Sequence, residues 1–199
     1  RRIGEHEYYW RITQWMMPFY SLIPQPSYPL SCRAYVPIDD EHTMVLFTSW
    51  NAERPYNAED IMILESGATG APTLIPGTFL PTQNRANDYG LDRQKQKTTS
   101  YTGIFGVNTQ DRALVETMGP IVDRENEYLG PADQAVIAAR KTLIRQAKAL
   151  MRGEEPLAPS DGSLYRVQPL DVKSRHAELA DLIAEHGHRL RCGDPATAG

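Results

Sequence analysis

The sequence predicts an α+β fold in which an antiparallel sheet from the first half of the chain carries helices from the second half. Runs rich in aromatic and β-branched residues, typical of strands, fill much of residues 8–50. Helical patterns follow at residues 110–118 and from the segment 130–133 to about residue 151. Hydrophobic residues make up 41% and charged residues 23% of the 199-residue chain, which are the proportions of an ordinary globular protein.

Residues 8–17 form the first predicted strand, which ends before Pro18. Bulky side chains alternate on both of its faces, so we expect a central strand that is covered on both sides. Arg11 lies among these aromatic residues. A guanidinium can hold a carboxylate through two parallel hydrogen bonds, so Arg11 is a candidate for substrate binding, with a purely structural ion pair as the alternative.

A loop and a hairpin are predicted next. Four prolines in residues 18–29 predict an extended loop without an interior strand. Strand patterns at 33–38 and 44–50 flank the acidic segment 39–42, which reads Asp-Asp-Glu-His. These side-chain types can bind metals, but adjacent turn residues point in divergent directions, so we interpret the segment as a turn.

The middle of the chain gives weaker signals. Residues 51–70 are polar apart from the apolar patch 61–64, which is too short to distinguish a helix from a strand. Residues 71–85 contain three prolines and a glycine and are predicted to be an irregular connection. Residues 87–99 are polar, and we expect a solvated surface there.

A short helix is predicted from Gln110 to Met118, with Asn108 and Thr109 as candidate caps and a stop at the Gly-Pro pair 119–120. One face of this helix carries Asp111, Leu114, Val115 and Met118. We expect this apolar face to be buried, and a buried carboxylate requires a cation, a metal ion or several hydrogen-bond donors. The alternative is an ordinary acid in the first turn, stabilised by the helix dipole.

The second half continues with a long helix that starts in the segment 130–133, with Pro131 in its first turn, and runs to about Met151; its apolar stripe is suited to packing across a sheet. A linker at 154–162, an extended piece at 165–172 and a helix at 174–185 capped by Ser174 follow. We interpret the histidines at 176, 186 and 188 as surface residues, with weak metal binding as the alternative. Residues 192–199 are expected to be disordered.

Several blocks of this sequence resemble one known family in the same order along the chain. They are YWRITQ at 9–14, PFY at 18–20, VPIDDEHT at 36–43, NDY at 87–89, LDR at 91–93, YTGI at 101–104, QD at 110–111, MGPIVDR at 118–124 and EYLG at 127–130, with Asp133 and Arg140. The family is that of Rieske non-haem iron aromatic ring-hydroxylating oxygenases, and the blocks look most like the C-terminal catalytic region of a phthalate 4,5-dioxygenase-like large (oxygenase) subunit. The resemblance spans roughly residues 7–153, and it implies that some of the residues Asn87, Tyr89, Asp92 and Arg93 hold structure near the helix that carries Asp111.

The resemblance implies a helix-grip (Bet v1-like) catalytic domain around a deep pocket, incomplete at its N-terminus. In that family the aspartate at the Asp111 position is the carboxylate of a 2-His-1-carboxylate site for mononuclear Fe(II). The two histidine ligands and the Rieske [2Fe-2S] motifs do not occur in this chain, and we expect them before residue 1. Polar neighbours orient metal ligands, so Asn108, Gln110 and Glu116 are candidates for supporting Asp111; Glu116 is equally suited to an ion pair with Arg112.

The function implied by the resemblance is hydroxylation of a phthalate-like aromatic acid with O2, using electrons from NADH that arrive through a flavin and iron–sulfur reductase. Two alternatives stay open: an aryl-ether O-demethylase of the same family and a non-catalytic ligand-binding domain. A trimer or a multiple of it is expected, and the isolated chain is expected to be inactive. The basic residues Arg93, Lys95 and Lys97 are an alternative docking patch for an acidic electron-transfer partner.

The predicted organisation is a catalytic part at residues 1–153, an extension with one helix at 154–191 and a tail at 192–199. The net charge of −4 argues against general nucleic-acid binding, which requires a basic surface. No apolar run is long enough for a membrane helix, and two distant cysteines make no disulfide framework. These features favour a cytoplasmic protein.

Overall fold

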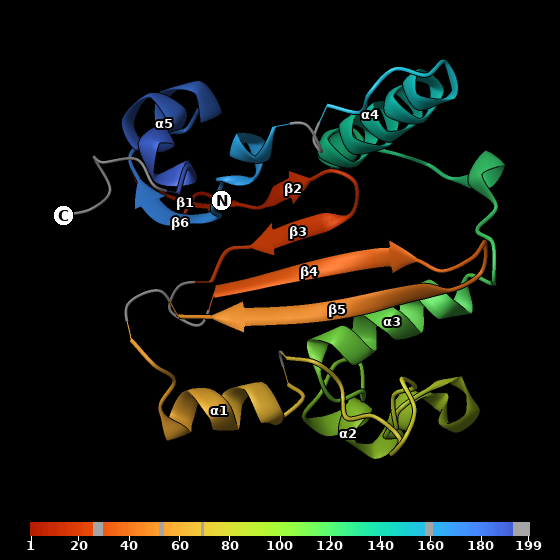
Figure 1. The fold of residues 1–199 in the computed structure, drawn as a ribbon. Helices are drawn as coiled ribbons and strands as arrows, with labels where there is room; N and C mark the ends of the chain where they lie inside the picture. Colours follow the sequence, from red (N-terminus) through yellow and green to blue (C-terminus); the bar gives the residue numbers. More distant parts are fainter. Residues whose placement is uncertain (26–29, 52–53, 69, 158–160, 193–199) are drawn as a thin grey trace. The chain divides into compact units, whose positions relative to one another are not determined.

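The computed structural model describes residues 1–25, 30–51, 54–68, 70–157 and 161–192 (Figure 1). The chain divides into two compact units, the first made of residues 1–36, 44–50 and 127–199 and the second of residues 37–43 and 51–126. Antiparallel strands and separate helices confirm the α+β class.

The first unit contains two antiparallel sheets. In the smaller sheet, β1 (Tyr8–Ile12) pairs with β6 (Leu170–Ser174), and Tyr8 lies opposite Ser174. The larger sheet has the order β2 (Gln14–Met16), β3 (Tyr20–Ile23), β4 (Leu30–Pro37) and β5 (Thr43–Trp50). Figure 1 shows β4 and β5 running in opposite directions, as a hairpin requires.

The prediction of one central strand at residues 8–17 is wrong. The run is interrupted at Thr13, so that β1 belongs to the smaller sheet and β2 is an edge strand of the larger one. The bulky residues on both faces of β1 reach across to the C-terminal segment: the Tyr9 hydroxyl donates to Asp171 at 2.5 Å, and the Trp10 indole donates to the His176 carbonyl at 2.9 Å. The aromatic residues therefore anchor a distant strand.

The prediction of a loop at residues 18–29 is wrong for its first half. β3 lies between Pro18 and Pro24 and contains no proline, so its N–H groups are free to pair with β2 and β4. Leu22 in β3 is buried. Residues 26–29 lie outside the described part of the chain.

The predicted hairpin turn after β4 is confirmed, and Asp39 organises it. Its carboxylate accepts hydrogen bonds from the backbone N–H groups of Glu41 and His42 at 2.8 and 2.7 Å. The Nδ1 atom of His42 lies 2.9 Å from the same carboxylate. The hydrogen bond from Glu41 and the contact with His42 hold the pKa of Asp39 below its ordinary value.

The long helix is confirmed as α4 (Gln134–Met151), preceded by the 3-10 turn η3 (Pro131–Asp133). Its start is fixed by residues from the recognised blocks: Asp133 accepts from the Gly130 N–H at 2.8 Å, and Arg140 makes a two-point ion pair with Glu127. The expected packing of its apolar stripe is not found, because Val136 and Leu150 are 45% and 60% exposed.

The C-terminal part contains η4 (Gly162–Tyr165), β6, α5 (Leu179–His186) and η5 (Gly187–Leu190). The helix predicted at 174–185 begins five residues late, because Ser174 is the last residue of β6. The Ser174 hydroxyl instead accepts the His176 N–H at 3.2 Å. Leu182 of α5 is completely buried. Residues 193–199, most of the predicted tail, are not described.

Glu185 of α5 bridges two of the predicted surface histidines. Its carboxylate lies 2.5 Å from Nε2 of His176 and 3.6 Å from Nε2 of His186. The hydrogen bond with His176, followed by the charges of the neighbouring basic groups, lowers the pKa of Glu185.

We therefore expect the stability contributed by Glu185 to be present above the ordinary pKa of a glutamate and to be lost as the pH falls through the lowered value. Thermal unfolding midpoints of the wild type and Glu185→Gln, measured between pH 7 and pH 3, should differ at neutral pH and converge in acid. Glu178→Gln is the control, since no ion pair joins that side chain to the described residues. A constant difference across the pH range would contradict this role.

The second unit contains α1 (Ala58–Glu65), η1 (Arg85–Gly90), α2 (Arg93–Thr98), α3 (Val107–Thr117) and η2 (Arg124–Asn126). A capping box between Asn57 and Asp60 starts α1, which resolves the ambiguous patch 61–64 as helical. Arg54 binds the buried Asp60 carboxylate at 2.5 Å. Residues 71–84 form an irregular connection, as predicted, apart from one bridge between Leu74 and Pro81.

The basic residues of α2 are exposed, which confirms the expected solvated surface. Arg93 donates to Gln96 at 2.8 Å, and Lys95 lies 3.9 Å from Asp92, whose carboxylate caps the helix. Alternate residues on a helix are about 200° apart around its axis, so Lys95 points away from the line that Arg93 and Lys97 share.

Candidate functional site

The start of α3 is set by glycine. Gly106 has φ +84°, and a Cβ atom built on it would lie 2.6 Å from the Gly67 carbonyl oxygen. The next N–H, that of Val107, donates to the Ala68 carbonyl at 3.0 Å. This close approach to Gly67 requires a glycine at position 106. The helix that follows it begins three residues earlier than predicted.

The prediction that Asn108 and Thr109 cap the helix is wrong. Both lie inside its first turn and are buried, with exposed fractions of 8% and 2%. The Asn108 amide donates to the Gly70 carbonyl at 2.6 Å. Polar side chains therefore face the interior here because the surrounding loops present carbonyl groups that need donors.

Two further side chains of α3 bind loop carbonyls. The Gln110 amide donates to Ile104 at 2.9 Å, and the Arg112 guanidinium donates to Gln83. Together with Asn108, they attach the first half of α3 to three separate loop positions. The inner face of the helix is therefore held mainly by hydrogen bonds.

Glu116 continues this inner face toward the end of the helix. The Tyr89 hydroxyl donates to its carboxylate at 2.7 Å, and the Arg112 Nε lies 3.4 Å away, which makes an ion pair without an aligned hydrogen bond. The Arg112–Glu116 pair was one of the two predicted roles of Glu116. The Arg112 side chain is 19% exposed and that of Glu116 is 41% exposed, so the pair lies at the edge of the inner face and not fully on the solvent face.

Tyr89 is held in an unusual backbone conformation. Its φ is +58°, and Asp88 before it has φ +49°. Such a conformation costs about 1–3 kcal/mol for a residue with a side chain. The Tyr89 ring is nevertheless 4% exposed, and burial together with the Glu116 hydrogen bond raises the pKa of Tyr89 to about 12.

The turn that carries Tyr89 is braced by Asn87 of the recognised NDY block and by Asn84 before it. The Asn87 side chain accepts the Asn84 N–H at 3.0 Å and donates to the Thr82 carbonyl at 2.7 Å. The Tyr89 N–H donates to the Asn84 carbonyl at 2.9 Å. These bonds maintain the left-handed backbone and direct the tyrosine ring toward α3.

The outer face of α3 carries Asp111, and the prediction that this face is buried is wrong. Asp111 is exposed, and Leu114, Val115 and Met118 are 70%, 59% and 55% exposed. The residues that α3 buries are Asn108, Thr109 and Ala113. The periodicity of the sequence predicted that the apolar stripe of the helix faces inward. In the structure, the loops of this unit bind the polar side of the helix instead.

Asp111 offers a carboxylate that is not already engaged. Within the described residues no hydrogen bond or ion pair reaches it, in contrast to Glu116 on the same helix. No group of three or more His, Cys, Asp or Glu residues in that part of the chain is arranged to hold a metal ion. A carboxylate is one of the ligand types that iron accepts, and the described residues do not supply a complete site.

The side chains predicted to support Asp111 contact other groups. Asn108 and Gln110 bind loop carbonyls, and Glu116 binds Tyr89 and Arg112. These contacts hold the backbone of the helix that carries Asp111. They can therefore act on the Asp111 carboxylate only by positioning that backbone. The resemblance predicted that some of the residues Asn87, Tyr89, Asp92 and Arg93 hold structure near this helix, and the Tyr89–Glu116 hydrogen bond is such a contact. Sequence patterns gave no sign of the contact between Arg112 and Gln83.

Arg11 has two structural contacts. It donates to the Pro24 carbonyl at 2.7 Å and lies 3.8 Å from Asp171, which also accepts the Tyr9 hydroxyl. These contacts favour the structural alternative over binding of a substrate carboxylate. Arg11 and Asp111 also belong to different compact units.

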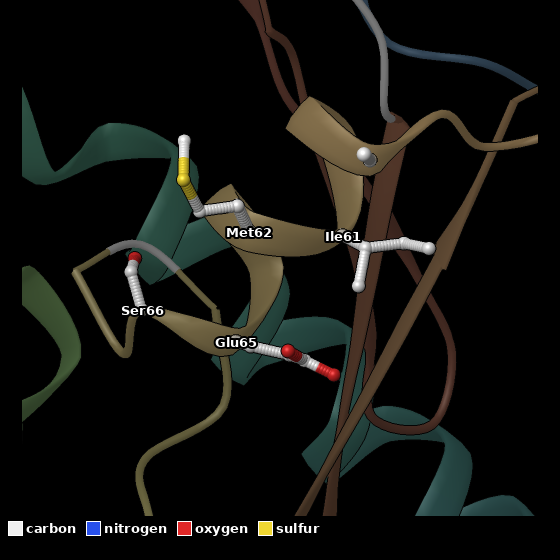
Figure 2. Close-up of a pocket in the computed structure, with 5 residues that line it drawn as sticks. Ile61, Met62, Glu65 and Ser66 are labelled. Carbon is white, nitrogen blue, oxygen red and sulfur yellow. The ribbon is translucent and has the colours of Figure 1, made fainter.

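A shallow apolar groove of about 470 Å³ runs along α1 and is lined by Ala58, Ile61, Met62, Glu65 and Ser66. Figure 2 shows the four labelled side chains projecting from this helix and the turn after it. No residue of α3 lines the groove. It is therefore not the predicted iron site.

Comparison with known proteins identifies the family. Residues 3–174 match the family model described as "LigXa C-terminal domain like". The chain belongs to the LigXa C-terminal domain-like family. The match confirms the resemblance of the sequence blocks: the chain is homologous to the C-terminal catalytic region of Rieske aromatic ring-hydroxylating oxygenases.

Two curated relatives support this LigXa-like assignment. The oxygenase subunit of 3-chlorobenzoate-3,4-dioxygenase from Comamonas testosteroni is 31% identical over 159 residues, which cover 73% of this chain and 37% of the relative. The phthalate 4,5-dioxygenase oxygenase subunit from Pseudomonas putida is 31% identical over 157 residues, covering 78% of this chain and 35% of the relative. The LigXa-like chain thus spans little more than a third of the length of these relatives.

None of its described helices is long and apolar enough to cross a membrane.

Proposed function

We propose that Asp111 of this LigXa-like chain is the carboxylate ligand of a mononuclear Fe(II) site in an oxygenase subunit that hydroxylates an aromatic carboxylic acid. Two histidines from elsewhere in the full-length protein would complete a 2-His-1-carboxylate set. When bound, such an iron supplies the chemistry that activates O2.

One observation carries this proposal: Asp111 presents an unengaged carboxylate from a helix that other side chains attach to neighbouring loops by hydrogen bonds. Asn108, Gln110 and Arg112 hold the first half of that helix to three loop positions. The bond between Tyr89 and Glu116 holds its second half, so the carboxylate projects from a firmly placed backbone. A metal ligand must be held in place in this way before the metal binds. The exposed Leu114, Val115 and Met118 beside it would form an apolar wall that limits water near the iron.

The proposed substrate class follows from the names of the two relatives, which are dioxygenases for 3-chlorobenzoate and phthalate. Both compounds carry a ring carboxylate. Arg11 is a weak candidate for binding it, because its guanidinium already contacts Pro24 and Asp171. Electrons would come from NADH through a reductase and a Rieske [2Fe-2S] cluster, with the subunits assembled as a trimer.

Metal analysis and oxygen consumption of the full-length gene product test the proposal. The purified protein should contain mononuclear iron in addition to cluster iron. With a reductase and NADH it should consume O2 when phthalate or 3-chlorobenzoate is added, and a product with added oxygen should form. A protein without mononuclear iron, or one whose oxygen consumption is indifferent to every aromatic acid tried, would contradict the proposal.

A further inference from the structure

We propose that Tyr89 is a positioning residue for Asp111: by holding Glu116, its hydroxyl fixes the rotation of α3 about its own axis. This inference rests on the proposed function, because it gives Asp111 the role of iron ligand. Tyr89 touches neither the proposed metal nor the substrate and acts only through the helix.

The distribution of contacts along α3 indicates that Tyr89 fixes the second half of the helix. Asn108, Gln110 and Arg112 attach the first half of the helix. Beyond Arg112, the one side-chain hydrogen bond that joins α3 to another segment of the described chain runs from Tyr89 to Glu116. Without it, the second half of the helix is held by the packing of Ala113 and by the ion pair within the helix itself.

The geometry of an α-helix explains how the contact between Tyr89 and Glu116 controls the position of the Asp111 carboxylate. Residues five apart on an α-helix are about 140° apart around the axis, so Glu116 and Asp111 lie on nearly opposite sides. A rotation of about 10° moves a side-chain atom about 5–6 Å from the axis by about 1 Å. Ligands and catalytic groups need to be placed within about 0.5 Å, so a small rotation of α3 is enough to misplace the carboxylate.

The strained backbone of Tyr89 supports the same conclusion. Glycine is the residue that adopts a positive φ without strain, and the chain has one immediately afterwards, at Gly90. A tyrosine in this conformation persists only where the surrounding structure compensates for it. Here the compensation consists of a buried ring and a hydroxyl directed at the helix that carries Asp111.

Fe(II) titration of the metal-depleted full-length gene product tests the inference. Tyr89→Phe keeps the ring and removes only the hydrogen bond to Glu116. We expect the dissociation constant of the mononuclear iron to rise about tenfold, in the range found when groups that orient a metal ligand are removed. The absorbance of the Rieske cluster should not change. Tyr101→Phe is the matched control, since Tyr101 is 96% exposed in the same unit.

Variants of Glu116 separate positioning from general stability. Glu116→Gln keeps an acceptor oxygen and should bind iron nearly as the wild type does, whereas Glu116→Ala should weaken binding as Tyr89→Phe does. Because the two residues act in series, Tyr89→Phe should add nothing in the Glu116→Ala background. Thermal unfolding of the metal-free variants shows whether each is folded at the temperature of the titration.

The iron measurements distinguish failure of the positioning role from failure of the iron-ligand assignment. If Asp111→Ala loses iron while Tyr89→Phe binds it as the wild type does, the positioning role is overturned and the iron site stands. A lower unfolding temperature for Tyr89→Phe with unchanged iron affinity likewise reduces Tyr89 to a structural residue. If Asp111→Ala retains its mononuclear iron, both the proposed function and this inference fail.

Discussion

In the full-length gene product, Asp111→Ala should lose its mononuclear iron and keep its Rieske absorbance. Removing a group that merely orients a metal ligand weakens binding or activity by about 10–100-fold, so the loss of a direct ligand should exceed about 100-fold. Oxygenation of an aromatic acid should fall at least as far. Iron content, cluster absorbance and product formation are the three measurements.

Because Asp111 is exposed, Asp111→Ala should remove the carboxylate without changing the stability of the fold. No partner reaches its carboxylate within the described residues, so the free energy of unfolding of the 199-residue chain should change by less than about 0.5 kcal/mol. A loss of iron therefore cannot be attributed to unfolding. Asp181→Ala removes an exposed acid from α5 and serves as the control, with full iron and full turnover expected. Retention of iron by Asp111→Ala would refute the ligand assignment.

Gly106→Ala should destabilise the chain by about 3 kcal/mol through the start of α3. A positive φ costs a residue with a side chain about 1–2 kcal/mol, and crowding of a packed site adds about 1–3 kcal/mol. The crowding arises because the new Cβ would lie 2.6 Å from the Gly67 carbonyl oxygen. Urea unfolding followed by circular dichroism measures the effect.

Gly119→Ala, at the other end of the same helix, is the matched control. Gly119 has φ +95°, but a Cβ atom there would meet nothing within 4 Å, so only the conformational cost of about 1–2 kcal/mol applies. The difference between the two variants isolates the contact with Gly67. Equal losses in stability would contradict the close approach that positions α3.

The elements with a single dominant local signal were predictable from the sequence. Asp39 marks the hairpin turn because its side chain satisfies the backbone of the turn. α4 follows from a proline start, a long helical period and Gly153 after its end. Elements that depend on distant partners were predicted less well: β1 and β2 read as one strand, because no local signal shows that Tyr9 reaches Asp171.

The candidate site divides in the same way. Asp111 was found through the order of the sequence blocks, and family membership supports that resemblance. The orientation of α3 could not be predicted, since an apolar stripe ordinarily faces inward, and here loop carbonyls at Gly70, Ile104 and Gln83 select the polar side. The resemblance placed Tyr89 among the residues expected near this helix, but its bond to Glu116 and its positive φ could not be predicted, because backbone φ values leave no trace in composition or periodicity.

The pairing of β1 with β6 has a consequence for biosynthesis. Their opposed residues, Tyr8 and Ser174 at one end of the ladder, are separated by most of the chain. A ribosome must therefore synthesise some 160 further residues before β1 finds its partner, and until then an aromatic strand stays without one. Nascent chains truncated before residue 170 should consequently depend on chaperones and aggregate readily, whereas the β4–β5 hairpin can close as soon as it leaves the exit tunnel.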